Sequence, residues 1–197
     1  MKIRKICSIV AIIAIVSFIA AAGGFILYVS PPKDDVGVFD YPPEFFCKAE
    51  ENRIDYQTDG KCAAYASAYI LRSLGENLSG EELAPKIDRI FVPANSIASV
   101  FEKRGYKAEA RHGSVDTLKQ RLTSGTPIVV FIRIPGDTHY AVVVGYDEQN
   151  IYLADSIEEN ANATDARYNR ALTTEEFETV WKNGTILPDN VYIVVGI

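Results

Sequence analysis

The chain has few of the residues that build metal sites. It contains two histidines and three cysteines among 197 residues, and these residues do not have the clustered spacing of a zinc site. It also has no glycine-rich phosphate loop. We therefore expect neither a metal ion nor a cofactor.

The chain also has no excess of positive charge. Its formal net charge is −6 at pH 7, and no basic stretch compensates locally, which argues against a nucleic-acid partner. With 48% hydrophobic and 23% charged residues, the composition is that of a globular protein with one sizeable core.

Charged residues are absent from residues 6–29, and a run of this length can cross a membrane as a helix. A basic tail, residues 1–5, precedes the run and is expected to stay in the cytoplasm. We therefore expect a single-pass signal anchor that leaves everything after Ser30 outside the cell. The alternative is a signal peptide cleaved near Ala20-Ala21-Ala22, with secretion of the domain, but the apolar run continues beyond this triplet.

A proline-rich stretch follows the apolar run. Residues 30–44 contain Pro31-Pro32 and Pro42-Pro43, and proline disfavours both helices and central strands. We expect these residues to be a linker that holds the domain off the membrane. The folded domain is then expected to span residues 45–197.

The order of sequence patterns in this domain predicts an α+β fold. Helical patterns precede most of the strand patterns, and there is no βαβ alternation. A polar loop is expected over residues 158–170. Helices are expected over residues 62–75, 79–90, 93–105, 114–125 and 173–184, and strands over residues 106–111, 127–134, 139–146, 151–156 and 190–197.

Cys62 stands at the start of the first expected helix of the domain. Asp59-Gly60 is a turn signal, and an alanine-rich run follows the cysteine. The first turn of a helix stabilises a thiolate through its unpaired N–H groups and its dipole. Two alternatives stay open: Cys62 is a small core residue, or it forms a disulfide with Cys47.

A cysteine nucleophile needs a base, and the base needs a group that orients it. His112 is expected in an exposed polar loop, whereas His139 begins a strand, and Asp155 ends the next strand 16 residues later. If the hairpin loop has an odd number of residues, such as 147–149, Asp155 shares a sheet face with His139 as a direct or diagonal neighbour. A two-residue loop would place them on opposite faces.

Two stretches carry a resemblance to a known family. YQTDGKCAAYASAYILRSLG, residues 56–75, and HYAVVVGYDEQNIYLADS, residues 139–156, together resemble the papain-like cysteine peptidases, and most of all their bacterial branch of double-glycine leader peptidases. The resemblance covers about residues 45–197. It implies a helix that is headed by the cysteine and packs against a small antiparallel sheet that carries the histidine.

The resemblance also implies roles for individual residues. Cys62 would be the nucleophile, His139 the general base and acid, Asp155 the orienting acid, and Gln57 the side-chain donor to the oxyanion. Four residues separate Gln57 from Cys62, one fewer than is usual in the family. Ser156 follows the acid, where leader peptidases usually have proline.

The function that we expect is that of a bacterial, membrane-anchored cysteine peptidase outside the cytoplasm, acting on a peptide or protein substrate. Two alternatives stay open. The same triad could cleave peptidoglycan amides, or the domain could be a non-catalytic surface module that binds a partner.

Overall fold

The computed structural model describes residues 13–25, 30–48, 52–58, 60–87, 92–182 and 188–196. The chain forms two compact units, Met1–Ser30 and Pro31–Ile197.

The first unit contains the segment that we expected to be an anchor. Residues 13–25 are helical, and large apolar side chains such as Ile13 and Phe18 are exposed on this helix. Over the ranges that the structure describes, no helix has both the length and the apolar character needed to span a membrane. The remainder of the expected anchor, residues 6–12 and 26–29, and the basic tail lie outside the described residues.

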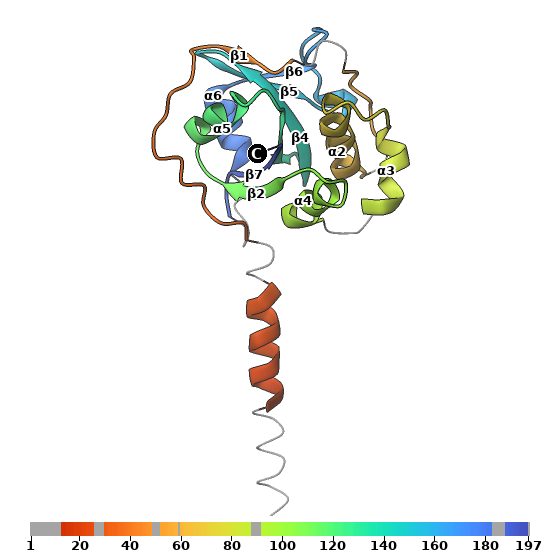
Figure 1. The fold of residues 1–197 in the computed structure, drawn as a ribbon, viewed down its shortest axis with the longest axis vertical. Helices are drawn as coiled ribbons and strands as arrows, with labels where there is room; N and C mark the ends of the chain where they lie inside the picture. Colours follow the sequence, from red (N-terminus) through yellow and green to blue (C-terminus); the bar gives the residue numbers. More distant parts are fainter. Residues whose placement is uncertain are drawn as a thin grey trace, which may run out of the picture. The chain divides into compact units, whose positions relative to one another are not determined.

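The second unit is built on an antiparallel sheet (Figure 1). Within the described ranges the sheet has seven strands in the order β2, β7, β3, β4, β5, β6, and β1 pairs with β4. The strands are β1 Phe45–Phe46, β2 Ala108–His112, β3 Ile128–Ile134, β4 Asp137–Tyr146, β5 Asn150–Ala154, β6 Arg170–Thr173 and β7 Val191–Val195.

Helices cover both faces of this sheet. Helices α2, α3 and α4 share one buried apolar cluster with the sheet, and α5 and α6 share a second cluster on the other face (Figure 1). The expected α+β architecture is confirmed. The helices are α2 Cys62–Ser73, α3 Gly80–Ile87, α4 Ala94–Glu102, α5 Val115–Leu122 and α6 Thr174–Trp181.

Local sequence signals explain where these helices begin. Ser79 and Glu82 form a reciprocal capping box before α3, with the Glu82 N–H donating to Ser79 Oγ at 3.3 Å and the Ser79 N–H donating to the Glu82 carboxylate at 2.7 Å. Thr173 and Glu176 repeat the arrangement before α6. Helix α2 differs, because its N-cap residue Lys61 makes no side-chain cap hydrogen bond.

Two predictions at the ends of elements are wrong. Arg170 begins strand β6 and pairs with Leu153, although we expected a loop through residue 170. His112 ends β2, where it pairs with Val191, although we expected it in a loop. In both cases pairing with a distant strand decides the conformation, and local composition does not report that pairing.

Most of the expected linker belongs to the second unit, which begins at Pro31, and is bound to the sheet and helices of that unit. We call residues 31–44 the strap. The carboxylate of Asp34 is buried and accepts hydrogen bonds from Arg121 at 2.8 and 2.6 Å and from the Tyr192 hydroxyl at 2.5 Å. The Asp34 N–H donates to the carbonyl oxygen of His112 at 2.8 Å. These contacts attach the strap to β2, α5 and β7.

Candidate active site

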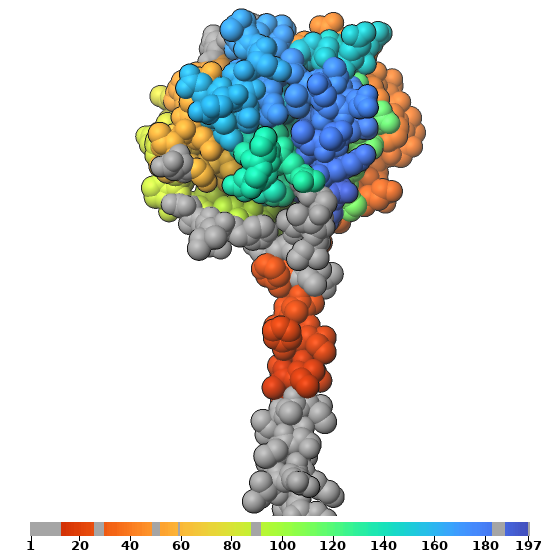
Figure 2. All heavy atoms as spheres, turned by 180° about the vertical axis from the view of Figure 1, so that it is seen from behind, coloured from red at the N-terminus to blue at the C-terminus, as the bar shows by residue number. Residues whose placement is uncertain are grey.

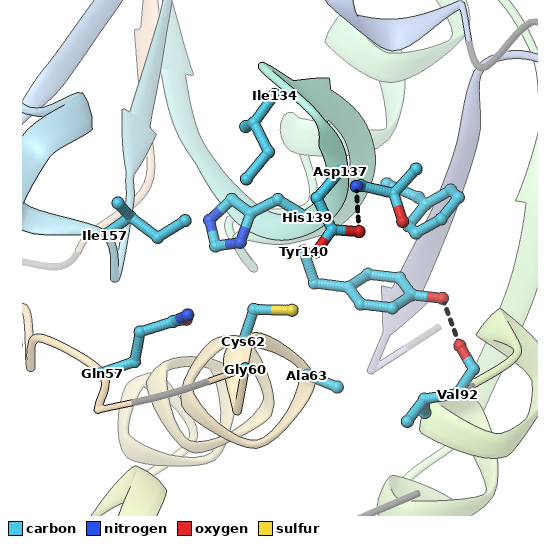
Figure 3. Close-up of a pocket in the computed structure, with 12 residues that line it drawn as sticks. Gln57, Gly60, Cys62, Ala63, Val92, Ile134, Asp137, His139, Tyr140 and Ile157 are labelled. Carbon is cyan, nitrogen blue, oxygen red and sulfur yellow. Dashed lines mark hydrogen bonds between the residues drawn. The ribbon is translucent and has the colours of Figure 1, made fainter. Parts of the chain in front are cut away.

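Cys62 is the first residue of α2 and lines a pocket of about 250 Å³. Its thiol is free and its side chain is half-buried. His139, which is the third residue of β4 and not its first as expected, lines the same pocket, and Figure 3 shows the two side chains on facing walls. The two residues that we singled out in the sequence, one at the start of α2 and one near the start of β4, therefore meet at one site.

A network around Glu81 holds the chain that leads into α2. The Glu81 carboxylate accepts hydrogen bonds from Lys61 at 3.0 Å, from Thr58 at 2.8 Å and from the Tyr65 hydroxyl at 2.9 Å. The hydrogen bonds from Lys61, Thr58 and Tyr65 lower the pKa of Glu81 to about 2. Because Glu81 lies in α3, this network ties the loop before Cys62 to a neighbouring helix.

His139 and Asp155 form a buried pair. The Nε2 atom of His139 lies 2.7 Å from Oδ1 of Asp155. The exposed fraction is 1% for the His139 side chain and 0% for the Asp155 side chain. With Nε2 engaged by the carboxylate, the imidazole ring has a fixed orientation, and its other nitrogen is available for a different partner.

The register between β4 and β5 determines this contact. The pairs beside the turn are Tyr146 with Ile151 and Gly145 with Tyr152, and those beyond an irregularity are Val143 with Leu153 and Val142 with Ala154. The turn thus encloses four residues between paired positions, an even number, and a β-bulge between Val143 and Gly145 shifts the register by one. If the shifted register continues by one more residue, Asp155 lies opposite Ala141. Ala141 is two residues from His139 on β4, so both lie on the same face of the sheet. Without the bulge, Asp155 would be on the other face.

Several groups besides His139 hold the Asp155 carboxylate, and none of them was predicted from the sequence. The Ile157 N–H donates to Oδ1 at 2.9 Å, and Arg170 and Asn160 donate to Oδ2 at 2.8 and 3.1 Å. The Asn169 side chain binds the backbone of Asp155. Its Oδ1 accepts a hydrogen bond from the Asp155 N–H, and its Nδ2 donates one to the Asp155 carbonyl oxygen, both at 2.8 Å. Asn160, Asn169 and Arg170 lie in the stretch interpreted as a polar loop, which has no periodicity that would indicate their contacts.

The two members of the pair shift each other's protonation. Burial alone would lower the pKa of His139, but hydrogen bonds to Asp155 and Cys62, with the charges on both, outweigh it and raise this pKa to about 9. Burial would raise the pKa of Asp155. The hydrogen bond from His139 and the positive charge of His139, with the hydrogen bonds from the Ile157 N–H and from Arg170, outweigh burial and lower this pKa. Both shifts favour a protonated His139 beside an anionic Asp155.

Gln57 lies on the pocket wall next to Cys62. Its backbone N–H donates to the carbonyl oxygen of Ser156 at 2.8 Å, and its side-chain oxygen accepts a hydrogen bond from the Ser156 hydroxyl at 2.7 Å. The structure therefore brings Gln57, Cys62 and His139 to one pocket, and Asp155 is buried next to His139 without lining the pocket.

Cys47 has a different environment. It is buried in the apolar cluster beneath α5 and α6, and burial raises the pKa of its thiol to about 12. Both Cys47 and Cys62 are free. The alternative of a Cys47–Cys62 disulfide is therefore wrong for this structure.

Apolar side chains form much of the remaining pocket wall. The Tyr140 hydroxyl donates to the Val92 carbonyl oxygen at 2.8 Å, which links β4 to the residues before α4. In the space-filling view, the gold segment near residue 60, the teal segment of the β3–β4 turn and the light-blue segment after β5 meet on one face (Figure 2). Among the described residues, no group of three or more His, Cys, Asp or Glu side chains is arranged to hold a metal ion.

Comparison with known proteins gives both a family and a fold. A family model described as Peptidase_C39 like family matches residues 49–185. No curated protein matches the chain significantly.

Solved structures of low sequence identity share the fold. The peptidase domain of Streptococcus ComA, a bifunctional ABC transporter involved in quorum sensing, is 18% identical with a TM-score of 0.59, over 74% of this chain and 98% of that one. A putative C39-like peptidase from Bacillus anthracis is 16% identical, also with a TM-score of 0.59, over 78% and 98%. A double glycine motif protease from an AMS/PCAT transporter, in complex with its leader peptide, is 15% identical with a TM-score of 0.55, over 85% and 97%.

Proposed function

Since the chain belongs to the Peptidase_C39 like family, a family of cysteine peptidases, we propose that it hydrolyses peptide bonds through an acyl-enzyme, with Cys62 as nucleophile. The observation that supports this best is the buried 2.7 Å contact between His139 and Asp155 at a pocket that Cys62 also lines. A nucleophile, a base and a group that orients the base are the parts that this chemistry needs.

The proposed reaction begins from a Cys62 thiolate beside a protonated His139. The thiolate attacks the carbonyl carbon of the substrate, a carbon–sulfur bond forms, and the carbonyl π electrons move to the oxygen. When this intermediate collapses, the carbon–nitrogen bond breaks, and the leaving amine takes the proton of His139. His139 then takes a proton from water, which attacks the thioester and releases Cys62.

Asp155 and Gln57 have supporting roles in this proposal. Asp155 keeps the ring of His139 oriented and stabilises its positive charge. The side-chain amide of Gln57 donates a hydrogen bond to the oxygen that becomes negative during the attack. Removal of one such donor typically costs a hundredfold or more in rate, on the order of 3 kcal/mol.

We also propose that the peptidase is anchored outside the cytoplasm. Residues 1–5 would be the cytoplasmic tail, residues 6–29 the membrane anchor, residues 30–44 the connection, and residues 45–197 the peptidase domain. The support is the uncharged run after a basic tail, together with the helical conformation of residues 13–25. A peptide or protein outside the membrane would be the substrate.

The first experiment measures the rate of Cys62 alkylation by iodoacetamide against pH. The full-length chain in detergent micelles is compared with its His139→Ala variant, and labelling is followed on the peptide that contains Cys62. We expect fast labelling at pH 6 that is lost in His139→Ala, because a thiolate and not a thiol is the nucleophile. Cys47, buried and with a raised pKa, is the internal control that stays unlabelled.

Slow alkylation of Cys62 at pH 6 in the wild type would overturn the proposal. Labelling of Cys62 that rises only near pH 8.5 in both proteins is the behaviour of an ordinary thiol, and would favour a binding module without catalysis. If Cys62 is activated, a peptide library and purified peptidoglycan are compared as substrates. Cleavage of peptidoglycan alone would assign the site to cell-wall amidase chemistry.

A further inference from the structure

Ser156 and Gln57 make a two-point contact at the edge of the pocket. The backbone N–H of Gln57 donates to the Ser156 carbonyl oxygen at 2.8 Å, and the Ser156 hydroxyl donates to the Gln57 side-chain oxygen at 2.7 Å. Ser156 is 8% exposed, so water competes little for its hydroxyl. The contact joins residues that are 99 positions apart in the sequence.

The contact determines which end of the Gln57 amide is available to the pocket. With its oxygen occupied by Ser156, the amide keeps both N–H groups of Nε2 for another acceptor. Figure 3 shows the Gln57 side chain pointing from its loop toward Cys62. An amide turned the other way would present its oxygen to a developing negative charge and repel it.

The loop between Gln57 and Cys62 is held at both of its ends. Gln57 is bound to Ser156, and Lys61 and Thr58 are bound to Glu81 at 3.0 and 2.8 Å. The backbone of Gly60 has a positive φ of 59°, a conformation that glycine adopts at little cost. The position of the amide therefore depends on contacts from outside the loop.

We propose that Ser156 is a positioning residue for the oxyanion donor: its hydroxyl holds the Gln57 amide with Nε2 toward the reacting oxygen. This inference rests on the proposed function and adds a residue to it. Ser156 directly follows Asp155, so one strand end serves both parts of the site. Asp155 orients the base, and Ser156 orients the donor.

The test separates acylation from alkylation of Cys62. Acylation by p-nitrophenyl acetate forms a carbon–sulfur bond through a negatively charged intermediate and releases nitrophenolate. Alkylation by iodoacetamide displaces iodide at a saturated carbon and forms no oxyanion. In the full-length chain, Ser156→Ala should therefore slow the acylation burst about tenfold, as expected for the loss of one buried hydrogen bond. Its alkylation rate at pH 6 should equal that of the wild type.

Two further variants test the route through Gln57. Gln57→Ala should slow acylation on the order of a hundredfold, and adding Ser156→Ala to it should cause no further loss, because the group that Ser156 positions is gone. Ser156→Thr retains a hydroxyl and should recover most of the rate lost in Ser156→Ala.

Three outcomes would overturn the proposal. Unchanged acylation in Ser156→Ala, multiplicative losses in the double variant, or equal losses of acylation and alkylation would each show that Ser156 does not act through Gln57. A wild-type chain that shows neither an acylation burst nor fast alkylation at pH 6 would overturn the proposed function together with this inference. If the wild-type chain shows both activities and one of the three outcomes above is observed, only the inference on Ser156 is overturned and the proposed function stands.

Discussion

At the scale of residues, the main feature is one buried carboxylate between two cationic side chains. Asp155 is fully buried and contacts His139 through one oxygen and Arg170 through the other. A carboxylate removed from water costs much free energy unless it is paired. The charges of His139 and Arg170 are therefore part of the stability of the fold as well as of the site.

The raised pKa of His139 predicts a stability that depends on pH. Its pKa is about 9 in the folded chain, against 6.5 for an unperturbed histidine, so the stabilisation is complete below pH 6.5 and is lost as the pH rises through about 9. The free energy of unfolding should fall by up to about 3 kcal/mol over this interval. Urea unfolding at half-unit pH steps measures it, and the decline should be absent in His139→Ala.

Arg170→Met should destabilise the fold on the order of 3 kcal/mol, because the variant removes one partner of a buried pair and leaves Asp155 charged. The Arg170 side chain is only 12% exposed. Arg53→Met is the control, since Arg53 is paired to Asp55 at an exposed position and should cost less than about 1 kcal/mol. Equal losses in the two variants, measured by urea unfolding, would contradict a special role for Arg170.

At the scale of elements, a β-bulge in β4 places Asp155 on the same face of the sheet as His139. Strand β4 changes its register against β5 between Val143 and Gly145. At the bulge, strand β1 approaches so closely that a Cβ atom on Gly145 would lie 2.8 Å from the carbonyl oxygen of Phe45 and nearer still to the Phe46 ring. The absence of a side chain at this position therefore allows β1 to pair with β4.

Gly145→Ala should destabilise the second unit by about 1–3 kcal/mol, because the new methyl group has no space. It should also slow the alkylation of Cys62 at pH 6 if β4 shifts relative to α2. Gly37→Ala is the control, since nothing lies within 4 Å of a Cβ atom there. A Gly145→Ala variant as stable as Gly37→Ala would show that β1 moves aside freely.

The elements also show what the sequence could predict. The start of α2 at Cys62 was predictable, because a turn and an alanine run are local signals. The shared face of His139 and Asp155 was expected from an odd hairpin loop, but a bulge produces it, and the close approach of β1 that accompanies the bulge is a tertiary contact. The partners of Asp155 were missed because they lie in a stretch without periodicity.

At the scale of the whole second unit, the strap joins segments that are far apart in the sequence. Asp34 contacts Arg121 and Tyr192, which are 87 and 158 positions away. Burial would raise the pKa of Asp34, but hydrogen bonds from Arg121 and Tyr192 lower it. The prolines of the strap predict irregular structure from the sequence alone. That the strap is bound to the domain follows only from its contacts with residues far away in the sequence.

Asp34→Ala should destabilise the second unit on the order of 3 kcal/mol and expose the strap, because Arg121 and Tyr192 lose a buried partner. Faster trypsin cleavage after Lys33 and a lower urea midpoint would measure the two effects. The exposed neighbour Asp35 offers the control Asp35→Ala, which should change neither. Unchanged cleavage in Asp34→Ala would mean that other contacts suffice to hold the strap.

The position of β7 affects the order in which the molecule can be completed. This strand, Val191–Val195, is the last of the described strands in chain order, yet it lies between β2 and β3 inside the sheet, and its Tyr192 binds the strap. During translation, the earlier strands leave the ribosome with this place empty, and the strap has no Tyr192 to bind. The sheet can therefore close only after residues 191–195 have been synthesised and have left the ribosome.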